Sequence, residues 1–476
     1  MADRRMLTRI GIRTAGGLVG AGIAVVVVAG ASLLPLPGFA IGAPQQTVRP
    51  VPADQQRVCP GPILALAADA GEATRPTSLG EPTVAAGTDG PEIQTRSLTP
   101  DADSAGEAEA PELLSTATPQ GATTPPLFAA AQAQVAQTED LAGLASAACA
   151  EPSADTWLVG GSTALGQTSL VLLANPTSVD ASVDLTIYAE TGPVDAPGAT
   201  GIVVPAGAQK VVPLAGLAPS AAAPVVRVRT SGGEVVASLQ QSYEQGIQPR
   251  GVELTGATAA PERQQIITGV TIANLAAVTA GQSGESVGVD FPTVRLLVPG
   301  DADADVQIGA VGENGTAAGN SYSQTVKAGN VAEIPLQGLK DGSFTVTVNS
   351  SVPVVAAVRT SVIGSKARDF SWFAASRALA DKAMYVAPSG PGAMLHLSNP
   401  TEADRTVTMT PQSGAAKKIT VPAEGGSNLV VAAGRYTLDD AKGLYGSVSM
   451  GADGVASSFA LNPPGPLAAP IDVYPR

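Results

Sequence analysis

The chain has 476 residues, a formal net charge of −14, 44% hydrophobic residues and only 3% aromatic residues. The acidic balance argues against nucleic acid as a partner, because phosphate binding requires clustered Lys and Arg. The length predicts about two to four domains. The 53 Gly and 39 Pro favour short strands and turns over long helices.

The first 40 residues are typical of a membrane anchor. Four arginines within residues 1–13 precede a segment, 16–36, that is almost wholly apolar. As a helix this segment would reach about 31 Å, enough to cross a bilayer, and the arginines before it favour a cytoplasmic N-terminus. A cleaved signal peptide is the alternative, because Gly38-Phe39-Ala40 resembles a cleavage site. The apolar run is, however, longer than the roughly 7–15 residues usual in a signal peptide.

We therefore predict a single-pass protein of the cell membrane that uses this segment as an uncleaved signal anchor. Everything after the helix is expected outside the cytoplasm. The predicted parts are a cytoplasmic tail (1–13), a transmembrane helix (14–37) and a linker (38–56).

A low-complexity acidic stretch follows the linker. Between Asp69 and Asp140 there are twelve carboxylates against two bases, Arg75 and Arg96. Such a composition buries too little apolar surface to order itself. We predict an N-terminal strand of the first sandwich at 57–64 and a disordered acidic insert at 65–140. The Ala-rich run at 127–149 is expected to form one helix or a partly ordered lead-in.

After residue 150 short β-branched runs are bounded by Gly, Pro and Asn, and the series occurs three times. Leu172-Leu173-Ala174-Asn175-Pro176 in the first copy corresponds to His396-Leu397-Ser398-Asn399-Pro400 in the third. Asn bonds the following backbone and Pro ends sheet pairing, so the Asn-Pro step is interpreted as structural. Trp157, Ile266 and Trp372 are expected to open the three copies.

Roughly 100 residues with about seven short strands are typical of an immunoglobulin-like sandwich. A propeller is less favoured, because three blades fall short of its usual four to eight or so. We predict an all-β protein of tandem immunoglobulin-like β-sandwich modules at 141–261, 262–365 and 366–476. They follow the single transmembrane helix and the disordered insert.

Three short segments, in this order along the chain, carry a family resemblance. They are Arg57-Val58-Cys59-Pro60-Gly61-Pro62, Trp157-Leu158-Val159-Gly160-Gly161-Ser162 and Leu172-Leu173-Ala174-Asn175-Pro176. Together they resemble an actinobacterial family of envelope proteins catalogued as domain of unknown function 5719, over nearly the whole chain. The resemblance implies a membrane-anchored, extracytoplasmic β protein. It supplies no reaction and no catalytic residue.

The residues that catalysis would need are scarce. His396 is the only histidine, which excludes a multi-His metal site and leaves one location for a Ser-His-Asp triad. In its expected strand it alternates with apolar Leu395 and Leu397, so it should face away from the core as an ordinary surface or interface residue. Gly160-Gly161-Ser162-Thr163-Ala164 fails as a nucleophile elbow at its last position.

Asp301, Asp303 and Asp305 form the one carboxylate cluster with alternate acids that could bind Ca²⁺. Val306 and Gly312 stand where a calcium loop needs Gly and Glu, so an acidic turn is the favoured interpretation.

Trp157 and Trp372 stand at corresponding places of two copies, which favours core packing over a sugar-binding platform. We assign no catalytic, cofactor-binding or metal-ligating residue, and we expect no cofactor.

Cys59 and Cys149 are the only cysteines, and both follow the predicted anchor. Oxidising compartments favour pairing of two such cysteines. We predict a disulfide that ties the strand at 57–64 onto the first sandwich, with the acidic insert bulging between them.

These observations lead us to expect a non-catalytic, membrane-anchored envelope protein. It would act as a scaffold or binding module for a cell-wall polymer or a membrane protein partner. One alternative is a wall-active hydrolase or transferase with a scattered carboxylate site, which two converging carboxylates in a deep cleft would reveal. The other alternative is a calcium- or sugar-binding adhesive module.

Overall fold

The computed structural model describes residues 46–48, 53–66, 75–102, 109–280, 288–315, 317–463 and 471–473, together with Gly22. The chain divides into two compact units, Val51–Ala468 and a smaller unit made of Met1–Pro50 and Ala469–Arg476. The predicted cytoplasmic tail and transmembrane helix lie outside the described residues, apart from Gly22. Among the described residues, no helix has the length and apolar character needed to cross a membrane.

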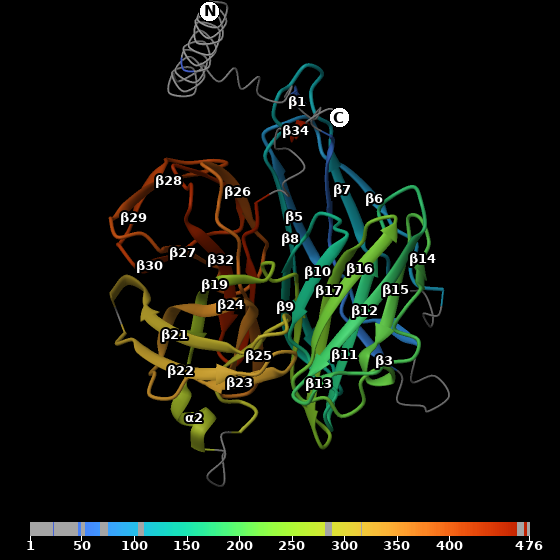
Figure 1. Ribbon diagram of the computed structural model, residues 1–476, viewed down its shortest axis with the longest axis vertical. Helices are drawn as coiled ribbons and strands as arrows, with labels where there is room; N and C mark the ends of the chain where they lie inside the picture. Colours follow the sequence, from blue (N-terminus) through green and yellow to red (C-terminus); the bar gives the residue numbers. More distant parts are fainter. Residues whose placement is uncertain are drawn as a thin grey trace, which may run out of the picture. The chain divides into compact units, whose positions relative to one another are not determined.

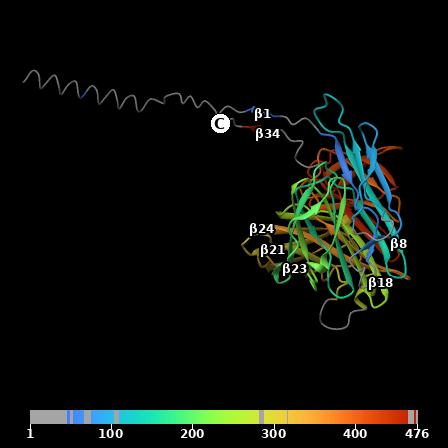
Figure 2. The ribbon, with the colours of Figure 1, turned by 90° about the vertical axis from the view of Figure 1, so that its right-hand side faces the viewer.

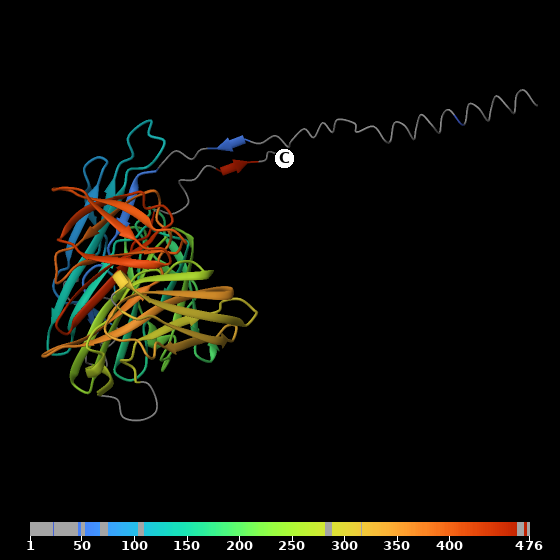
Figure 3. The same cartoon turned by 90° about the vertical axis from the view of Figure 1, so that its left-hand side faces the viewer.

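The smaller unit contains one antiparallel pair of strands. β1 (Gln46–Val48) pairs with β34 (Ile471–Val473), so that Thr47 lies opposite Asp472, and Figure 3 shows the two arrows side by side.

The larger unit confirms the all-β class, and its strands form four modules that each contain two or more small sheets (Figure 1). Module 1 has one sheet in the order β10-β16-β12-β13, with β14 on β12, and a second in the order β15-β11-β17-β18. Its strands are β10 (Asp155–Val159), β11 (Gln167–Ala174), β12 (Ala181–Ala189), β13 (Gly192–Pro193), β14 (Ile202–Val204), β15 (Gln209–Pro213), β16 (Val225–Gly232), β17 (Val236–Gln245) and β18 (Gln248–Thr255), with the 3-10 helix η1 (Leu214–Gly216) after β15.

Module 3 repeats this order, with sheets β26-β31-β28-β29 and β30-β27-β32-β33. Its strands are β26 (Lys382–Ala387), β27 (Met394–Asn399), β28 (Arg405–Pro411), β29 (Lys417–Val421), β30 (Gly425–Val430), β31 (Gly434–Asp439), β32 (Tyr445–Ala452) and β33 (Val455–Ala460). In both modules the first strand pairs with the sixth long strand rather than the second. The immunoglobulin order, in which the first strand pairs with the second, is therefore not the order of these sheets.

Module 2 has the same plan, except that the 22-residue strand β24 (Gly342–Ile363) serves both sheets. The first part of β24 pairs with β19 and β21, and its second part pairs with β20 and β25. Figure 2 shows β24 beside β21. The other elements are β19 (Glu262–Ile272), α2 (Leu275–Ala280), β20 (Thr293–Leu297), β21 (Ala304–Gly312), η2 (Glu313–Gly315), β22 (Asn320–Val326), β23 (Val331–Pro335) and β25 (Arg368–Ala374).

The expected boundary at 365/366 and the expected start of the third copy at Trp372 are wrong. β25, which contains Trp372, pairs with β24 of module 2, and module 3 begins with β26. Trp157 and Trp372 therefore hold different places in their modules. Both strands are short and contain a Trp among apolar residues, so composition alone does not distinguish a first strand from a last one.

A fourth, N-terminal module occupies most of the stretch that we predicted to be a disordered insert. Its sheets are β2-β7-β6, β5-β8-β9 and β3-β4. Residues 67–74 and 103–108 of this stretch lie outside the described residues. The strands are β2 (Gln55–Val58), β3 (Leu64–Leu66), β4 (Pro76–Ser78), β5 (Thr83–Thr88), β6 (Gln94–Ser97), β7 (Glu112–Thr116), β8 (Phe128–Gln137) and β9 (Ala142–Ala148).

The Ala-rich run that we expected to be helical or only partly ordered is the hairpin of β8 and β9. Ala is small enough for this hairpin to be covered closely by its neighbours: Ala131, Ala133 and Leu144 lie in the same apolar cluster as the core of module 3. Burial against other modules thus supplies the stabilisation that the composition lacked by itself.

The four modules form a closed ring around their last strands. β9 contacts β18, β18 contacts β25, β25 contacts β33, and β33 contacts β9. The ring thus contains four modules, one more than the three repeats that the sequence pattern indicates.

Inside a module the two sheets share one core, and outward-facing residues contact the next module. β12 alternates buried and more exposed residues, as expected for a strand with one covered face. β11 and β27 are buried on both faces over most of their length. Asn175 and Asn399, both fully buried, bond the backbone of the following turn with the same partners in each copy, which supports their structural interpretation.

Candidate functional site

The axis of the ring is built around one buried carboxylate, that of Asp369 on β25. Its Oδ2 accepts hydrogen bonds from the backbone N–H groups of Leu144 (2.8 Å) and Ala456 (3.2 Å). Its Oδ1 accepts from Val252 (3.2 Å) and from Phe370 (3.0 Å). One side chain therefore joins all four modules. Burial raises the pKa of Asp369, and the four N–H donors oppose that rise.

Two glycines allow the central strands to approach this carboxylate. A Cβ at Gly143 would lie 2.7 Å from Asp369 Oδ1, and a Cβ at Gly251 would lie 2.5 Å from the same atom. Both glycines have positive φ, +156° and +142°. Close backbone approach, rather than a turn, is therefore the reason that glycine stands at these positions.

A second buried carboxyl, Glu253 of β18, lies next to this axis. Its Oε1 accepts a hydrogen bond from Ser457 (2.5 Å) and from the backbone N–H of Leu254 (3.0 Å). Ser457 in turn bonds Ser146 of β9, with 2.8 Å between the two Oγ atoms. Burial raises the pKa of Glu253 well above that of an ordinary glutamate, while the bond from Ser457 lowers it. Both carboxyls are enclosed rather than open to a cleft, with Glu253 0% and Asp369 2% exposed.

The contact between modules 2 and 3 contains the histidine. His396 of β27 lies with Nδ1 2.6 Å from Glu313 Oε2 and Nε2 2.7 Å from Ser449 Oγ. Both His396 and Glu313 are fully buried, whereas Ser449 of β32 is half-buried. As expected for an interface residue, His396 faces away from the core of its own module, and module 2 covers that face.

Glu313 accepts further hydrogen bonds besides the one from His396. Its carboxylate also accepts hydrogen bonds from Gly269 N–H (3.0 Å) and the Asn428 amide (3.0 Å). Burial alone would raise the pKa of Glu313, but His396, Asn428 and Gly269 together hold it below the ordinary value. An ionised carboxylate only accepts hydrogen bonds, so Nδ1 of His396 carries a proton and donates a hydrogen bond to Glu313. The other ring nitrogen, Nε2, pairs with the hydroxyl of Ser449.

This Glu-His-Ser array has the hydrogen-bond order of a nucleophilic triad. Acyl transfer also needs donors for the oxyanion, normally backbone N–H groups beside the nucleophile. β32 is paired on both sides at Ser449, with Met394 of β27 and with Ser458 of β33. The N–H of Ser449 therefore belongs to the sheet ladder, and the array is better suited to joining two modules than to catalysis.

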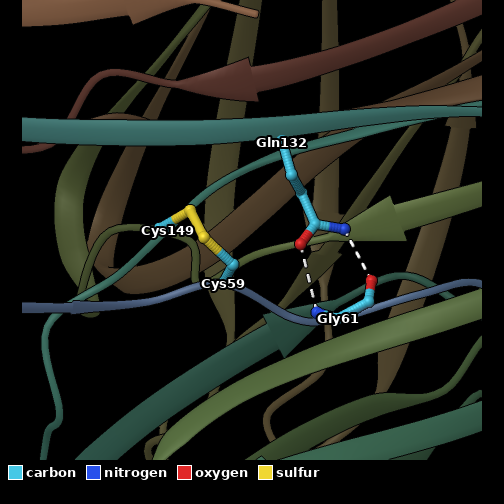
Figure 4. Close-up of a disulfide and its surroundings, with 4 residues drawn as sticks. All are labelled: Cys59, Gly61, Gln132 and Cys149. Atoms are coloured by element: carbon cyan, nitrogen blue, oxygen red, sulfur yellow. Dashed lines mark hydrogen bonds between the residues drawn. A yellow bond between two sulfur atoms is a disulfide. The ribbon is translucent and has the colours of Figure 1, made fainter. Parts of the chain in front are cut away.

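The disulfide between Cys59 and Cys149 is confirmed, and its two cysteines are 90 positions apart in the sequence. It lies in the small core of the N-terminal module, beside Phe128 and Leu114, rather than between that segment and module 1. Figure 4 shows its neighbour Gln132, whose amide bonds both the N–H (3.1 Å) and the C=O (2.7 Å) of Gly61.

The acidic turn at Asp301, Asp303 and Asp305 resembles a cap rather than a metal site. Asp303 accepts a hydrogen bond from Ala328 N–H, and Asp305 accepts from Thr325 Oγ1. Asp180 and Asp404 bond the corresponding backbone of modules 1 and 3 in the same way as Asp303. In the part of the chain that the structure describes, no group of three or more metal-ligating side chains converges.

Both tryptophans are buried at the contact of modules 1 and 2. Trp157 and Trp372 belong to one apolar cluster there and are 5% and 1% exposed. Trp372 Nε1 donates to Gln241 Oε1 (2.7 Å), and the guanidinium of Arg295 lies 4.5 Å from the ring centroid. Core packing is therefore the correct interpretation for both rings, although the core is that of a module contact.

An open groove of about 550 Å³ lies beside Trp157 at the same contact. Its lining includes the ion pair of Asp155 and Arg227. Nε of Arg227 lies 2.9 Å from Oδ1 of Asp155, and Nη2 lies 2.5 Å from Oδ2. The remaining lining comes from loops of module 2 and includes Pro261, Pro299 and Asp301.

Residues 101–433 match a protein family described as "Family of unknown function (DUF5719)". The chain belongs to this family. No curated protein matches this DUF5719 chain. A solved structure described as "Crystal Structure of Thermotoga maritima 1070" matches at 17% identity with a TM-score of 0.20, covering 24% of this chain and 93% of that chain. A similarity at this level supports no inference about fold or function.

Sequence reasoning missed Asp369, Glu253 and Glu313. Asp369 precedes the mostly apolar run Phe370–Ala374, and Glu253 lies between Val252 and Leu254, so a lone acid among apolar residues was the available signal. Glu313 carried no such signal, because it lies in the short helix η2 next to Asn314 and Gly315 and reads as a turn.

Proposed function

We propose that this DUF5719 protein is a non-catalytic envelope protein of an actinobacterium, held in the cell membrane by residues 14–37. Its modules would stand outside the cytoplasm and act as a scaffold or binding module for a cell-wall polymer or a membrane protein partner. The arginine-flanked apolar segment and the paired cysteines support this location, because disulfides persist in oxidising compartments.

The observation that carries the proposal is the use of the buried polar groups. Asp369 spends both oxygens on backbone N–H groups from four modules, and Glu313 with His396 joins modules 2 and 3. Such groups hold a rigid ring together, and their hydrogen-bonding capacity is largely used within it. A rigid ring with several exposed loops suits presentation and binding.

A wall-active hydrolase is the second candidate, and the Glu313-His396-Ser449 order is the observation that favours it. The test is labelling with a fluorophosphonate probe, which reacts with activated serines. We expect no labelling of the full chain. Labelling that disappears in Ser449→Ala and persists in Ser447→Ala would establish a serine-dependent activity and contradict the non-catalytic proposal.

The proposal itself is tested by chemical crosslinking in intact cells, followed by identification of the attached proteins and glycans. We expect wall glycan or one membrane protein on the modules, and none on a cytoplasmic fusion at the N-terminus. Crosslinks from the modules to cytoplasmic proteins would overturn the predicted orientation.

A further inference from the structure

The groove between modules 1 and 2 has the mixed character of a ligand site. Its volume of about 550 Å³ lies within the range of small-molecule pockets, which often occur at domain contacts. The apolar lining residues include Trp157, Pro261, Pro299, Val352 and Pro353. The polar lining residues are Asp155, Arg227 and Asp301.

Two of the polar lining residues have unused hydrogen-bonding capacity: Arg227 as a donor and Asp301 as an acceptor. Arg227 uses Nε and one Nη2 proton on Asp155, and its Nη1 makes no hydrogen bond within the described part of the chain. The carboxylate of Asp301 is exposed and likewise makes no hydrogen bond to any described residue. The face of Trp157 lies 5.0 Å from the guanidinium carbon, so the ring holds Arg227 in position.

Charge selects among the ligands that could use these groups. Asp155, Arg227 and Asp301, together with Arg229 opposite Asp155 on the neighbouring strand, give this surface a formal charge of about zero. It therefore offers no surplus of positive charge for a phosphate-rich or uronic polymer. A neutral sugar offers hydroxyls that both donate to Asp301 and accept from Nη1 of Arg227. Its C–H face can pack on the proline rings and the edge of Trp157.

We propose that this groove binds a segment of neutral polysaccharide, with Arg227 and Asp301 contacting sugar hydroxyls and the prolines contacting the sugar rings. The inference rests on the proposed function, because it names the ligand class for the wall-binding role. A proline-rich peptide would also fit an apolar groove, but it offers no row of hydroxyls for the two unused polar groups.

The test uses the full chain purified in mild detergent and measures dissociation constants for neutral hexose oligosaccharides of several linkages. A phosphorylated glycan and a proline-rich peptide serve as competing probes. Arg227→Gln and Asp301→Asn are expected to weaken binding of one neutral oligosaccharide by about tenfold or more each. The matched controls, Arg368→Gln on β25 and Asp195→Asn in module 1, are exposed and outside the groove lining, and should leave binding within about twofold.

Three results would overturn the assignment. Oligosaccharide binding that survives both groove variants would place the sugar elsewhere and leave the wall-binding function standing. Groove-dependent binding of the phosphorylated glycan or the peptide alone would contradict the ligand class. Absence of any glycan binding, together with a membrane protein as the crosslinked partner in cells, would remove the sugar site while supporting the scaffold role.

Discussion

His396 Nδ1 lies 2.6 Å from Glu313 Oε2, so the chain's single histidine is bonded to a carboxylate of the neighbouring module. The two residues are separated by 83 positions in sequence and lie on β27 and η2. Their contact determines the first two predictions.

Replacing His396 by Ala should destabilise the protein. The variant leaves the ionised Glu313 buried without its main partner, and we expect a loss of about 3 kcal/mol in the free energy of unfolding. Denaturant unfolding of the exported protein measures it. Ser449→Ala, which removes only the hydrogen bond between Ser449 and Nε2 of His396, should cost about 1 kcal/mol. Equal melting of wild type and His396→Ala would show that the contact is dispensable.

The Glu313 contact should also make stability depend on acid. Because the pKa of folded Glu313 is lowered, its stabilisation is present above the ordinary glutamate pKa of about 4.3 and is lost as pH falls through the lower folded value. Wild type should therefore lose stability between about pH 5 and pH 3 more steeply than Glu313→Gln. The exposed Glu402→Gln in module 3 is the control. Parallel pH profiles for Glu313→Gln and wild type would refute this.

Glu253 should show the opposite dependence. Its folded pKa is raised by burial, so its contribution is fully present below the unfolded pKa and is lost as pH rises toward the folded value. At pH 7 the folded protein must hold Glu253 protonated although the unfolded chain would release that proton. Glu253→Gln removes this free-energy cost. We expect it to be more stable than wild type at pH 7 by at least about 1 kcal/mol, with the gain vanishing near pH 4. A variant that is less stable at pH 7 would show that the carboxyl itself is required.

Removing the disulfide should weaken the whole ring. In the chain-entropy model a loop of 90 residues contributes about 4–5 kcal/mol, so Cys59→Ser should lower the melting temperature. Mass spectrometry of the exported protein should find both thiols oxidised. Two free thiols would contradict the bond.

The deletion of residues 69–125 should abolish folding. It removes β4 to β7 and thereby takes strands from all three sheets of the N-terminal module. A cooperative transition close to that of wild type would show that this module is not part of the stable ring.

Trp157→Ala and Trp372→Ala should each cost about 3–5 kcal/mol, the usual effect of emptying a buried aromatic site. Both rings lie in the cluster shared by modules 1 and 2, so the two losses should not add fully in the double variant. Full additivity would mean that the rings stabilise separate cores.

The sequence predicted the local features well and the arrangement of modules poorly. The Asn175 and Asn399 turns, the short strands and the Cys59–Cys149 bond follow from backbone chemistry and composition, and they were found as expected. These features depend on contacts between residues that are close in sequence, or on two cysteines that had no other partner.

The rest depends on contacts between modules. The hairpin of β8 and β9 is poor in large apolar residues and gains its order from modules 1 and 3, whose residues share its clusters. His396 was assigned to the correct face of its strand, but nothing near it in sequence indicates that Gly269 and Glu313 would cover that face. Pairings over such separations leave no local pattern.

The closing contact of the ring joins residues from opposite ends of the unit. Ser146 and Ser457 bond across 311 positions, and the cores of the first and last modules share one apolar cluster. A nascent chain cannot make this contact until β33 has been synthesised. Until then Ala131, Ala133 and Leu144 of the N-terminal module remain uncovered. Such long-range pairing folds slowly and is exposed to aggregation. The ring therefore cannot close before its last strand, β33, is complete. A chaperone or partner that shields β8 and β9 during synthesis would raise the yield of closed rings.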